Sequence, residues 1–265
     1  MRVFLRAFPA LLRVGFAEAM AYRAEFLVWT LCTTMPLVML AIWTAVARDA
    51  PVGMFTPSRF AAYYLGALIV RTVTGSWVVW EMNHEIRTGT LSLRLLRPIH
   101  PFLAYSAQHL AAIPLRGILA LPVATIMLLS TGSGHVLTDP VQAIVLVVAL
   151  LGAWLITFLA MTVIGTLGLF IDRSIAVFEV WLGAFMVLSG YLIPLDLLPP
   201  WVSTLAKWLP FRYMLGHPVE IMIGMTDRAQ ALAGCLVQWA WVGLFLLLSR
   251  ATWHAGVRRF EAYGG

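Results

Sequence analysis

Residues 85 to 98, EIRTGTLSLRLLRP, bring together side chains that could bind a carboxylate, a phosphate or a partner protein. The segment holds three arginines and one glutamate, although only 11% of the 265 residues are charged and 61% are hydrophobic. Gly89 predicts a tight turn, and Thr90 could cap a short helix from 91 to 96 that Pro98 ends. The segment therefore predicts a docking helix or, in a plainer interpretation, a polar loop whose charges are solvated.

The short helix expected in this segment would be amphipathic. Leu91, Leu95 and Leu96 would form its apolar face, and Arg94 and Arg97 would lie to one side of it. A helix of this kind can lay its apolar face in a groove on a partner protein. The arginines would then pair with acidic groups of that partner or with lipid phosphates.

Charged residues within apolar stretches are a second set of candidates. Arg71 lies about ten residues from either end of the stretch 61–80, about 15 Å from each membrane surface at about 1.5 Å per residue. An arginine at that depth costs about 2.5–3.5 kcal/mol, so it must face protein or water. Arg71 therefore lines a pathway or makes a structural contact, with Thr74, Glu179 or a backbone carbonyl as partner. Arg116 lies nearer the end of its own stretch, where its side chain could reach the interface.

Aromatic side chains complete the candidate pathway. Phe178, Trp181 and Phe185 recur along the stretch 175–193 and could contact an apolar substrate, although packing against lipid or a second subunit is the favoured interpretation for each of them. Glu179 lies in the same stretch, where it could pair with an arginine. The candidate substrate pathway thus comprises Arg71, Thr74, Glu179, Trp181 and Phe185.

The sequence lacks the motifs of common nucleotide-dependent and hydrolytic enzymes. Its one lysine, Lys207, stands outside any G-x-x-x-x-G-K-[ST] loop, so ATP would have to be hydrolysed by another chain. The G-x-S-x-G and H-E-x-x-H motifs are absent. His84, His100 and His109 lack metal-ligand spacing, so we expect no metal and no cofactor on this chain. An intramembrane enzyme would need acids and histidines at one depth, which the apolar stretches do not offer.

The elements that must position these residues are long apolar helices. A mean hydropathy of +0.88 does not suit a water-soluble domain, and a helix needs about 20 apolar residues to cross a bilayer. The sequence predicts one domain, 1–265, that is an all-α polytopic membrane protein with six transmembrane helices. The expected spans are 26–46, 61–80, 110–130, 141–170, 175–193 and 229–249.

The distribution of arginine and lysine predicts the orientation. The cytoplasmic segments would be 1–25, 81–109, 171–174 and 250–265, and the outer ones 47–60, 131–140 and 194–228. This arrangement places 11 of the 18 basic residues inside and 5 outside, with both termini in the cytoplasm. Arg2, Arg6 and Arg13 share one face of segment 1–25, which predicts an amphipathic helix on the membrane surface. The net charge of +6 follows from this topology and requires no nucleic-acid partner.

The outer segment 194–228 is too apolar for a solvated loop. Its prolines interrupt the chain, and Trp201, Leu205 and Trp208 then recur at helical spacing. We expect a helix at the outer interface anchored by the tryptophans. Non-helical backbone at membrane depth is tolerated where protein or water covers it, so the segment is either a re-entrant gate or an interfacial helix without a gating role.

Two stretches in this order resemble a known family. The element E-I-R-x-G-T-L followed by L-L-R-P comes after the second expected span, and SGYLIPLDLLPPWVSTLAKWLPFRYMLGHPVEIMIG occupies 189–224 before the last. Both resemble the permease subunits of ABC-2-type exporters, in the six-helix branch named ABC-2 family transporter protein that is linked to drug and toxin export. The resemblance spans essentially the whole chain.

The resemblance implies roles for both stretches. The coupling region that fits a cleft of the ATPase would comprise Glu85, Arg87, Thr88, Gly89, Thr90, Leu91, Arg94, Leu95, Leu96 and Arg97. The outer gate would comprise Ser189, Gly190, Pro194, Pro199, Pro200, Trp201, Pro210 and Phe211.

The resemblance also implies an assembly and an activity. Two copies of an ATP-binding subunit would carry ATP and Mg, and a second permease, identical or related, would complete the transporter in the bacterial cytoplasmic membrane. The expected function is ATP-driven export of a hydrophobic or amphipathic small molecule, with a cation as one option. The alternative is a secondary transporter driven by an ion gradient, for which paired half-sequences would be expected and no convincing repeat is found.

Overall fold

The structure is a computed structural model that describes residues 2–21, 34–131 and 137–260, and these residues are helical without any strand. The all-α prediction is therefore confirmed for the described part of the chain. The helices are α1 (Arg2–Ala21), α3 (Met35–Val46), α4 (Pro57–Thr74), α5 (Val78–Arg87), α6 (Leu91–Leu95), α7 (Pro101–Ala111), α8 (Ile113–Thr131), α9 (Pro140–Thr166), α10 (Ser174–Leu188), α11 (Pro200–Trp208), α12 (Pro210–Met214), α13 (Gly216–Met222) and α14 (Arg228–Val257), with short 3-10 turns η2 (Leu167–Leu169) and η3 (Leu195–Leu197).

Two of the described helices are each long and apolar enough to cross a membrane. They run over Pro140–Leu169 and Arg228–Val257. A third candidate is the pair Pro101–Ile118 and Ala120–Ser130, which meets at a bend of 56°. Pro122 lies just beyond this bend, and its ring would clash with the carbonyl of Ile118 in a straight helix.

The other expected spans are shorter or interrupted. α3 and α10 are apolar but shorter than a full span. Residues 26–33, the start of the first expected span 26–46, lie outside the described residues. The helix predicted over 61–80 is broken, because α4 ends at Thr74 and α5 begins at Val78. Gly75 and Ser76 stand at the break, and a Gly-Ser pair is a frequent cause of helix interruption.

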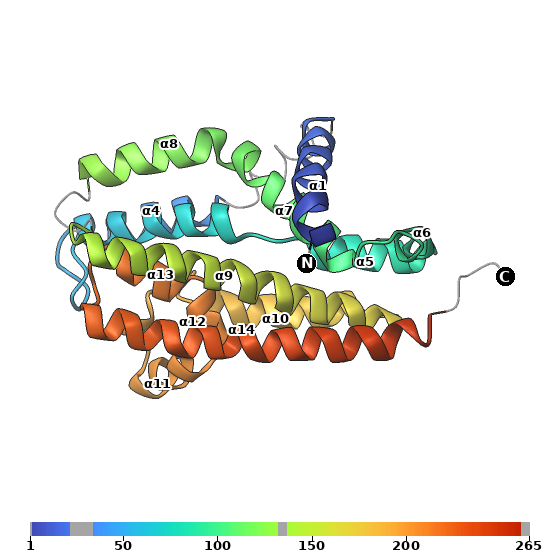
Figure 1. Cartoon of the computed structure of the whole chain (residues 1–265). Helices are drawn as coiled ribbons and strands as arrows, with labels where there is room; N and C mark the ends of the chain where they lie inside the picture. The colour runs from blue at the N-terminus through green and yellow to red at the C-terminus, as the bar shows by residue number, and fades with distance from the viewer. Residues whose placement is uncertain (1, 22–33, 132–136, 261–265) are drawn as a thin grey trace.

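α9 forms the centre of the bundle, with α14 along one side and α4, α5 and the α12–α13 segment around the rest (Figure 1). α9 and α14 run in the same direction, because their starts meet: Arg228, the first residue of α14, donates through Nη2 to Oδ1 of Asp139, the residue before α9, at 2.9 Å. Asp139 caps α9, and Asp227 caps α14 through a capping box with Gln230. Both helices thus start at one end of the molecule.

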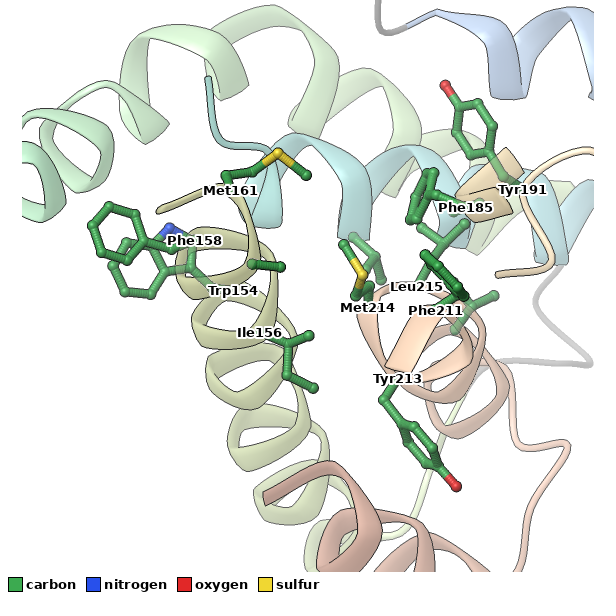
Figure 2. Packing of buried hydrophobic residues seen from close by; sticks show 14 of the residues in the cluster. Trp154, Ile156, Phe158, Met161, Phe185, Tyr191, Phe211, Tyr213, Met214 and Leu215 are labelled. Carbon is green, nitrogen blue, oxygen red and sulfur yellow. The ribbon is translucent and has the colours of Figure 1, made fainter. Parts of the chain in front are cut away.

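Aromatic residues pack around α9 (Figure 2). Trp154 and Phe158 stack on successive turns of α9, with ring centroids 5.2 Å apart. On the facing side, Phe211 of α12 packs against Trp181 of α10 at 4.5 Å. The α12–α13 segment is therefore an integral part of the core rather than a surface loop.

α1 crosses the bundle rather than joining it, and it packs on α7 (Figure 1). Gly15 allows the close approach, because a Cβ there would lie 3.0 Å from the Cα of Gln108. Val14, Phe16 and Met20 are exposed on α1. A helix set across the spans with exposed apolar side chains has the geometry expected of the predicted surface helix.

Candidate functional site

Residues 85–98 form a turn and a short helix at the end of the bundle where α9 and α14 finish (Figure 1). Gly89 adopts a φ of +74°, which ends α5 in a left-handed turn. α6 follows over Leu91–Leu95, one residue shorter than predicted. Thr90 occupies the N-cap position without a capping hydrogen bond. Its hydroxyl instead lies 2.8 Å from that of Thr88.

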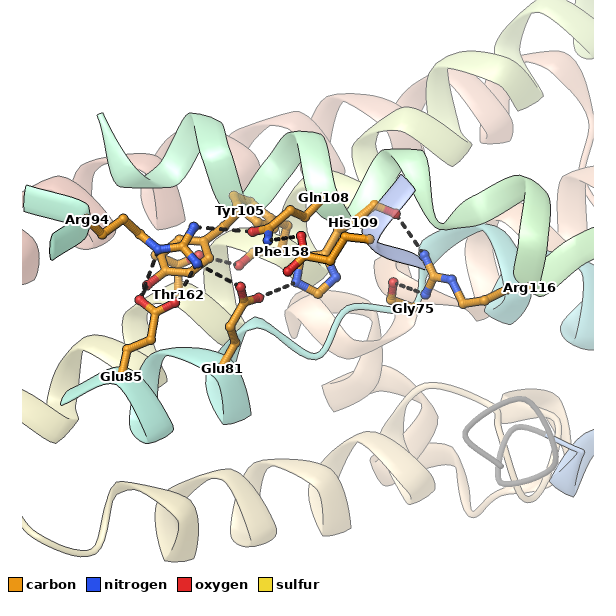
Figure 3. A network of polar contacts seen from close by, with 11 residues as sticks. Gly75, Glu81, Glu85, Arg94, Tyr105, Gln108, His109, Arg116, Phe158 and Thr162 are labelled. Atoms are coloured by element: carbon orange, nitrogen blue, oxygen red, sulfur yellow. Dashed lines mark hydrogen bonds and ion pairs between the residues drawn. The ribbon is translucent and has the colours of Figure 1, made fainter. Parts of the chain in front are cut away.

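Arg94 attaches α6 to the two helices beside it (Figure 3). Its guanidinium forms an ion pair with Glu85 and a second one, at 3.0 Å, with Glu81; both acids belong to α5. It also donates to Gln108 Oε1 at 3.2 Å and stacks 4.1 Å from the ring centroid of Tyr105, both on α7. The Tyr105 hydroxyl in turn donates to Glu85 at 2.6 Å.

This arrangement keeps Arg94 charged and engaged within the chain. Burial alone would lower its pKa, but the hydrogen bond to Glu85 and the neighbouring Tyr105, Glu81 and Glu85 raise the pKa above its usual value. The side chain is only 13% exposed. The expectation that Arg94 pairs with a partner protein or a lipid phosphate is therefore wrong, since its donors are satisfied inside the molecule.

The exposed tip of α6 consists of other residues. Leu93 is 62% and Leu96 is 82% exposed, and Arg97 is exposed beside them. Leu91 is fully buried and Leu95 packs against the core, so the apolar face predicted for 91, 95 and 96 is divided between core and surface. The outward surface is thus a pair of leucines flanked by one arginine.

Arg87 makes a second internal connection. Its Nη2 donates to the carbonyl of Asp172, 2.8 Å away, in the turn between α9 and α10. The end of α5 is therefore tied to two parts of the bundle, to α7 through the Arg94 cluster and to the α9–α10 turn through Arg87. A displacement of α6 would be transmitted to both.

The polar cluster continues from α6 to the break between α4 and α5 (Figure 3). His109 Nε2 lies 3.7 Å from the second oxygen of Glu81. Arg116 then donates through Nη2 to the carbonyl of His109 at 3.0 Å and through Nη1 to the carbonyl of Gly75 at 2.8 Å. Arg116 is buried, so the prediction that its side chain reaches the membrane interface is wrong.

Tyr105, Gln108, His109 and Arg116 were not among the predicted coupling residues. They lie on α7 and α8, and the prediction placed most of α7 in the cytoplasmic segment 81–109 without assigning it a helix. The signal that could have revealed this helix is His100-Pro101: proline favours the first helical position, and His100 caps the helix by accepting from the amide of Phe102.

The residues predicted for the substrate pathway do not all come together. Arg71, Trp181 and Phe185 line one small, partly open cavity. Thr74 is buried, and its hydroxyl donates to the carbonyl of Val70 in its own helix. Glu179 is exposed on α10, and the described residues include no ion pair between it and Arg71 or Arg173.

The predicted outer gate is a turn that returns the chain to the bundle after α10. Ser189 and Gly190 are buried, and Gly190 adopts a φ of +86°. Two tyrosines of α4 fasten this turn: Tyr63 donates to the carbonyl of Gly190 at 2.9 Å and Tyr64 to that of Leu192 at 2.8 Å. The sequence does not predict a role for these tyrosines, because nothing local distinguishes them from other core residues.

The remaining residues of the predicted gate separate into a surface part and a buried part. Pro199, Pro200 and Trp201 are exposed at the start of α11. Trp201, near the start of the helix, and Trp208, at its end, are each 72% exposed. Pro194, Pro210 and Phe211 are buried. The predicted interfacial helix is thus confirmed as a helix, and the segment that re-enters the bundle is α12–α13.

Buried polar pairs hold α12 and α13 in place. Arg212 and Glu220 form an ion pair at 2.6 Å, and Gln238 of α14 donates to the carbonyls of Tyr213 and Ala149 at 2.8 and 2.9 Å. His217 packs so closely on Gly234 that a Cβ there would lie 2.2 Å from its ring. Within the described residues, no three His, Cys, Asp or Glu side chains converge to hold a metal ion.

The described fold, with apolar helices of membrane-spanning length packed around one another, is consistent with a helical membrane protein. A family model described as ABC-2 family transporter protein matches residues 35–264. The chain therefore belongs to this family, and the predicted resemblance is confirmed. A search of curated proteins found no match.

Membership of the family establishes a general role. The chain is a multi-pass transport permease, a membrane component without an ATPase of its own. Permeases of this family work in general with an ATP-binding cassette partner.

Proposed function

We propose that this chain is the permease of an ATP-driven exporter and that α6, with the turn before it, docks against the ATP-binding subunit. The observation that carries the proposal is the Arg94 cluster, which holds a five-residue helix firmly while leaving Leu93, Leu96 and Arg97 exposed. A helix this short is not stable by itself, so an internal anchor suits an element that must bear a load.

The path from α6 into the bundle supports a role in coupling. Polar contacts run from Arg94 to Glu81 and on to the ring of His109, whose Nε2 lies 3.7 Å from Glu81. Arg116 then binds the backbone carbonyls of His109 and of Gly75 at the α4–α5 break (Figure 3). A helix break is a place where two rigid segments can change their angle. Closure of the ATPase would thus alter the angle between α4 and α5.

In the proposed assembly, two ATP-binding subunits carry ATP and Mg, and a second permease, identical or related, completes the pathway in the bacterial cytoplasmic membrane. α10 supports a permease contact, because it exposes Val177, Val180 and Val187, while Gly183 has open space beside it. The cargo is a hydrophobic or amphipathic small molecule taken from the cytoplasm or the inner leaflet. It would leave beside the turn at Gly190 and the α12–α13 segment.

The test is copurification of an ATPase with the tagged chain from native membranes in mild detergent. We expect a subunit with a phosphate-binding loop to copurify with the wild type. Leu96→Glu places a charge on the exposed tip and should reduce the recovered ATP hydrolysis by roughly ten-fold or more, the effect of burying an unpaired charge at an interface.

The matched control is Ala255→Glu, which adds the same charge at an exposed position of α14 near the same end of the bundle. It should leave the recovered ATPase unchanged. A well-folded wild-type chain that purifies without any ATPase would refute the exporter proposal. Equal loss in both variants would refute the assignment of docking to α6.

A further inference from the structure

Two arginines, Arg116 buried and Arg71 partly buried, meet where α4 ends. A Cβ added to Gly75 would lie 3.3 Å from Nη1 of Arg116 and 3.8 Å from Nη1 of Arg71, so the two guanidinium groups flank the same glycine. Arg116 is 6% exposed. Its terminal nitrogens bind two carbonyls, but its Nε has no partner among the described residues.

Aromatic rings and one hydroxyl, rather than acids, surround this pair. The guanidinium carbon of Arg71 lies 5.4 Å from the ring centroid of Phe185 and 5.8 Å from that of Trp77. The guanidinium carbon of Arg116 lies 5.9 Å from the ring centroid of Trp77. The hydroxyl of Tyr191 also lies close to Arg71. The described part of the chain provides no carboxylate in ion-pair contact with either arginine.

Such a pair is electrostatically unfavourable. Two like charges repel each other more strongly away from water, and cation–π contacts offset only about 0.5–2 kcal/mol each. Buried charges are normally paired with an opposite charge. The pair therefore leaves positive potential without a counter-charge in the middle of the apolar bundle.

A small, partly open cavity lies beside the pair. It has a volume of about 30 Å³ and is lined by Arg71, Ser76, Trp77, Trp181, Phe185 and Met214 among others. The hydroxyl of Ser76 and the indole nitrogen of Trp181 are buried there without a hydrogen-bond partner among the described residues. The unused groups around the cavity are thus mainly hydrogen-bond donors, while its walls are otherwise apolar.

We propose that this cavity binds the anionic headgroup, a carboxylate or a phosphate, of an amphipathic molecule, and that this molecule is the transported substrate. The inference rests on the proposed function, and it replaces the cationic substrate suggested by sequence with an anionic one. Arginine donors suit both headgroups, and Phe178, Leu182 and Met161 line the same cavity where an alkyl tail would lie.

The cavity as it stands has room for about one water molecule, so binding requires it to open. The α4–α5 break is where it would open, because Trp77 and Ser76 lie in the break and also line the cavity. Arg116 connects this break to α6. Opening would thus be linked to the state of the ATPase.

The first measurement is binding to the purified permease in nanodiscs of phosphatidylcholine alone, with no ATPase required. The probe is 12-bromododecanoate, whose bromine quenches tryptophan fluorescence, and its matched control is 12-bromododecyltrimethylammonium. We expect saturable quenching by the anion at a concentration at least about ten-fold below that of the cation. The variant Trp181→Phe should lose part of the saturable signal.

Substitutions in α4 test whether the charge of Arg71 binds the anion. Arg71→Gln should weaken binding of the anion by roughly 10- to 100-fold, as expected for loss of a charge-assisted hydrogen bond. Arg71→Lys should retain part of it. Arg59→Gln makes the same change at the start of α4, where the side chain donates to the carbonyl of Met54, and should bind as the wild type does.

The outcomes separate this inference from the proposed function. Equal quenching by both probes, or an unchanged Arg71→Gln, would overturn the anion site even if an ATPase copurifies. Two results together would identify a resident lipid site and overturn the substrate assignment. The first is saturable binding that vanishes in nanodiscs containing phosphatidylglycerol, and the second is a failure of dodecanoate to stimulate ATP hydrolysis in the assembled complex. Anion-selective binding with dodecanoate-stimulated hydrolysis supports it. Failure of any ATPase to copurify would count against the proposed function, while the quenching result would still decide the site.

Discussion

At the scale of single residues, neighbouring arginines have different tasks. Arg94 satisfies its donors with residues of α5 and α7, whereas Arg97, three positions later, is exposed. The two are indistinguishable by residue type. What separates them is that Arg94 points back toward the acids of α5, while Arg97 lies beyond the end of α6. Arg94 therefore holds α6 against α5 and α7, whereas Arg97 is exposed.

Replacement of Arg94 should loosen α6 from the bundle. Arg94→Gln leaves Glu81 and Glu85 without their cation, and breaking a largely buried ion pair costs about 3 kcal/mol or more. We expect the Tm in detergent to fall by roughly 6–12 °C and proteolysis within 88–98 to become faster. Arg97→Gln should change neither. Equal Tm values for the two variants would contradict the assignment of Arg94.

At the scale of elements, the return of the chain after α10 depends on one turn. Gly190 has a left-handed backbone that other residues rarely adopt, and Tyr63 of α4 donates to its carbonyl. Both features are needed for residues 191–199 to reverse direction and for α12–α13 to enter the bundle. The turn thus determines whether the re-entrant segment reaches the core.

A side chain at Gly190 should therefore be poorly tolerated. Its Cβ would lie 2.2 Å from the hydroxyl of Tyr63, and its backbone would be strained as well. We expect Gly190→Ala to lower the Tm by roughly 5 °C or more, corresponding to about 2 kcal/mol. Gly183→Ala has open space in α10 and should be neutral or slightly stabilising.

A double variant separates the two causes at Gly190. Tyr63→Phe removes the hydroxyl that would clash, so Gly190→Ala with Tyr63→Phe should recover part of the lost Tm relative to the sum of the single variants. A strictly additive loss would show that backbone strain alone is responsible.

At the scale of the whole molecule, the two ends of the bundle have different contents. α6 and the ends of α9 and α14 lie at one end, and the ion pair between Asp139 and Arg228 lies at the other (Figure 1). The excess of arginine in the segments around α6 predicts that this end faces the cytoplasm. The proposed docking surface and the proposed exit therefore lie on opposite sides of the membrane.

Labelling of single cysteines tests this orientation. In a background with Cys32→Ala and Cys235→Ala, Leu96→Cys should react with a membrane-impermeant maleimide only after the cells are opened. Asp49→Cys, exposed in the loop before α4, should react in intact cells. The predicted topology places one crossing, the stretch 61–80, between Asp49 and α6. Reaction of both positions from the same side would require an even number of crossings there and would contradict that topology.

The sequence by itself determined the solvent, the helical class, the family and the position of the turn at Gly89. These depend on local properties: long apolar runs require a bilayer, and Gly89 with Thr90 and Pro98 encodes a turn and a short helix within a few residues. The resemblance carried by 85–98 and 189–224 was equally readable, because it rests on letters in order.

Only the tertiary structure decided which polar residues work together. Arg94 contacts α5 and α7, Arg116 reaches the carbonyl of Gly75 about forty positions earlier, and Tyr63 binds a turn that follows α10. The break at Gly75 and Ser76 carried a local signal, but its consequence did not. It brings Arg71 and Arg116 together because two helices distant in sequence pack there, and packing of that kind depends on the shape of the whole core rather than on any local pattern.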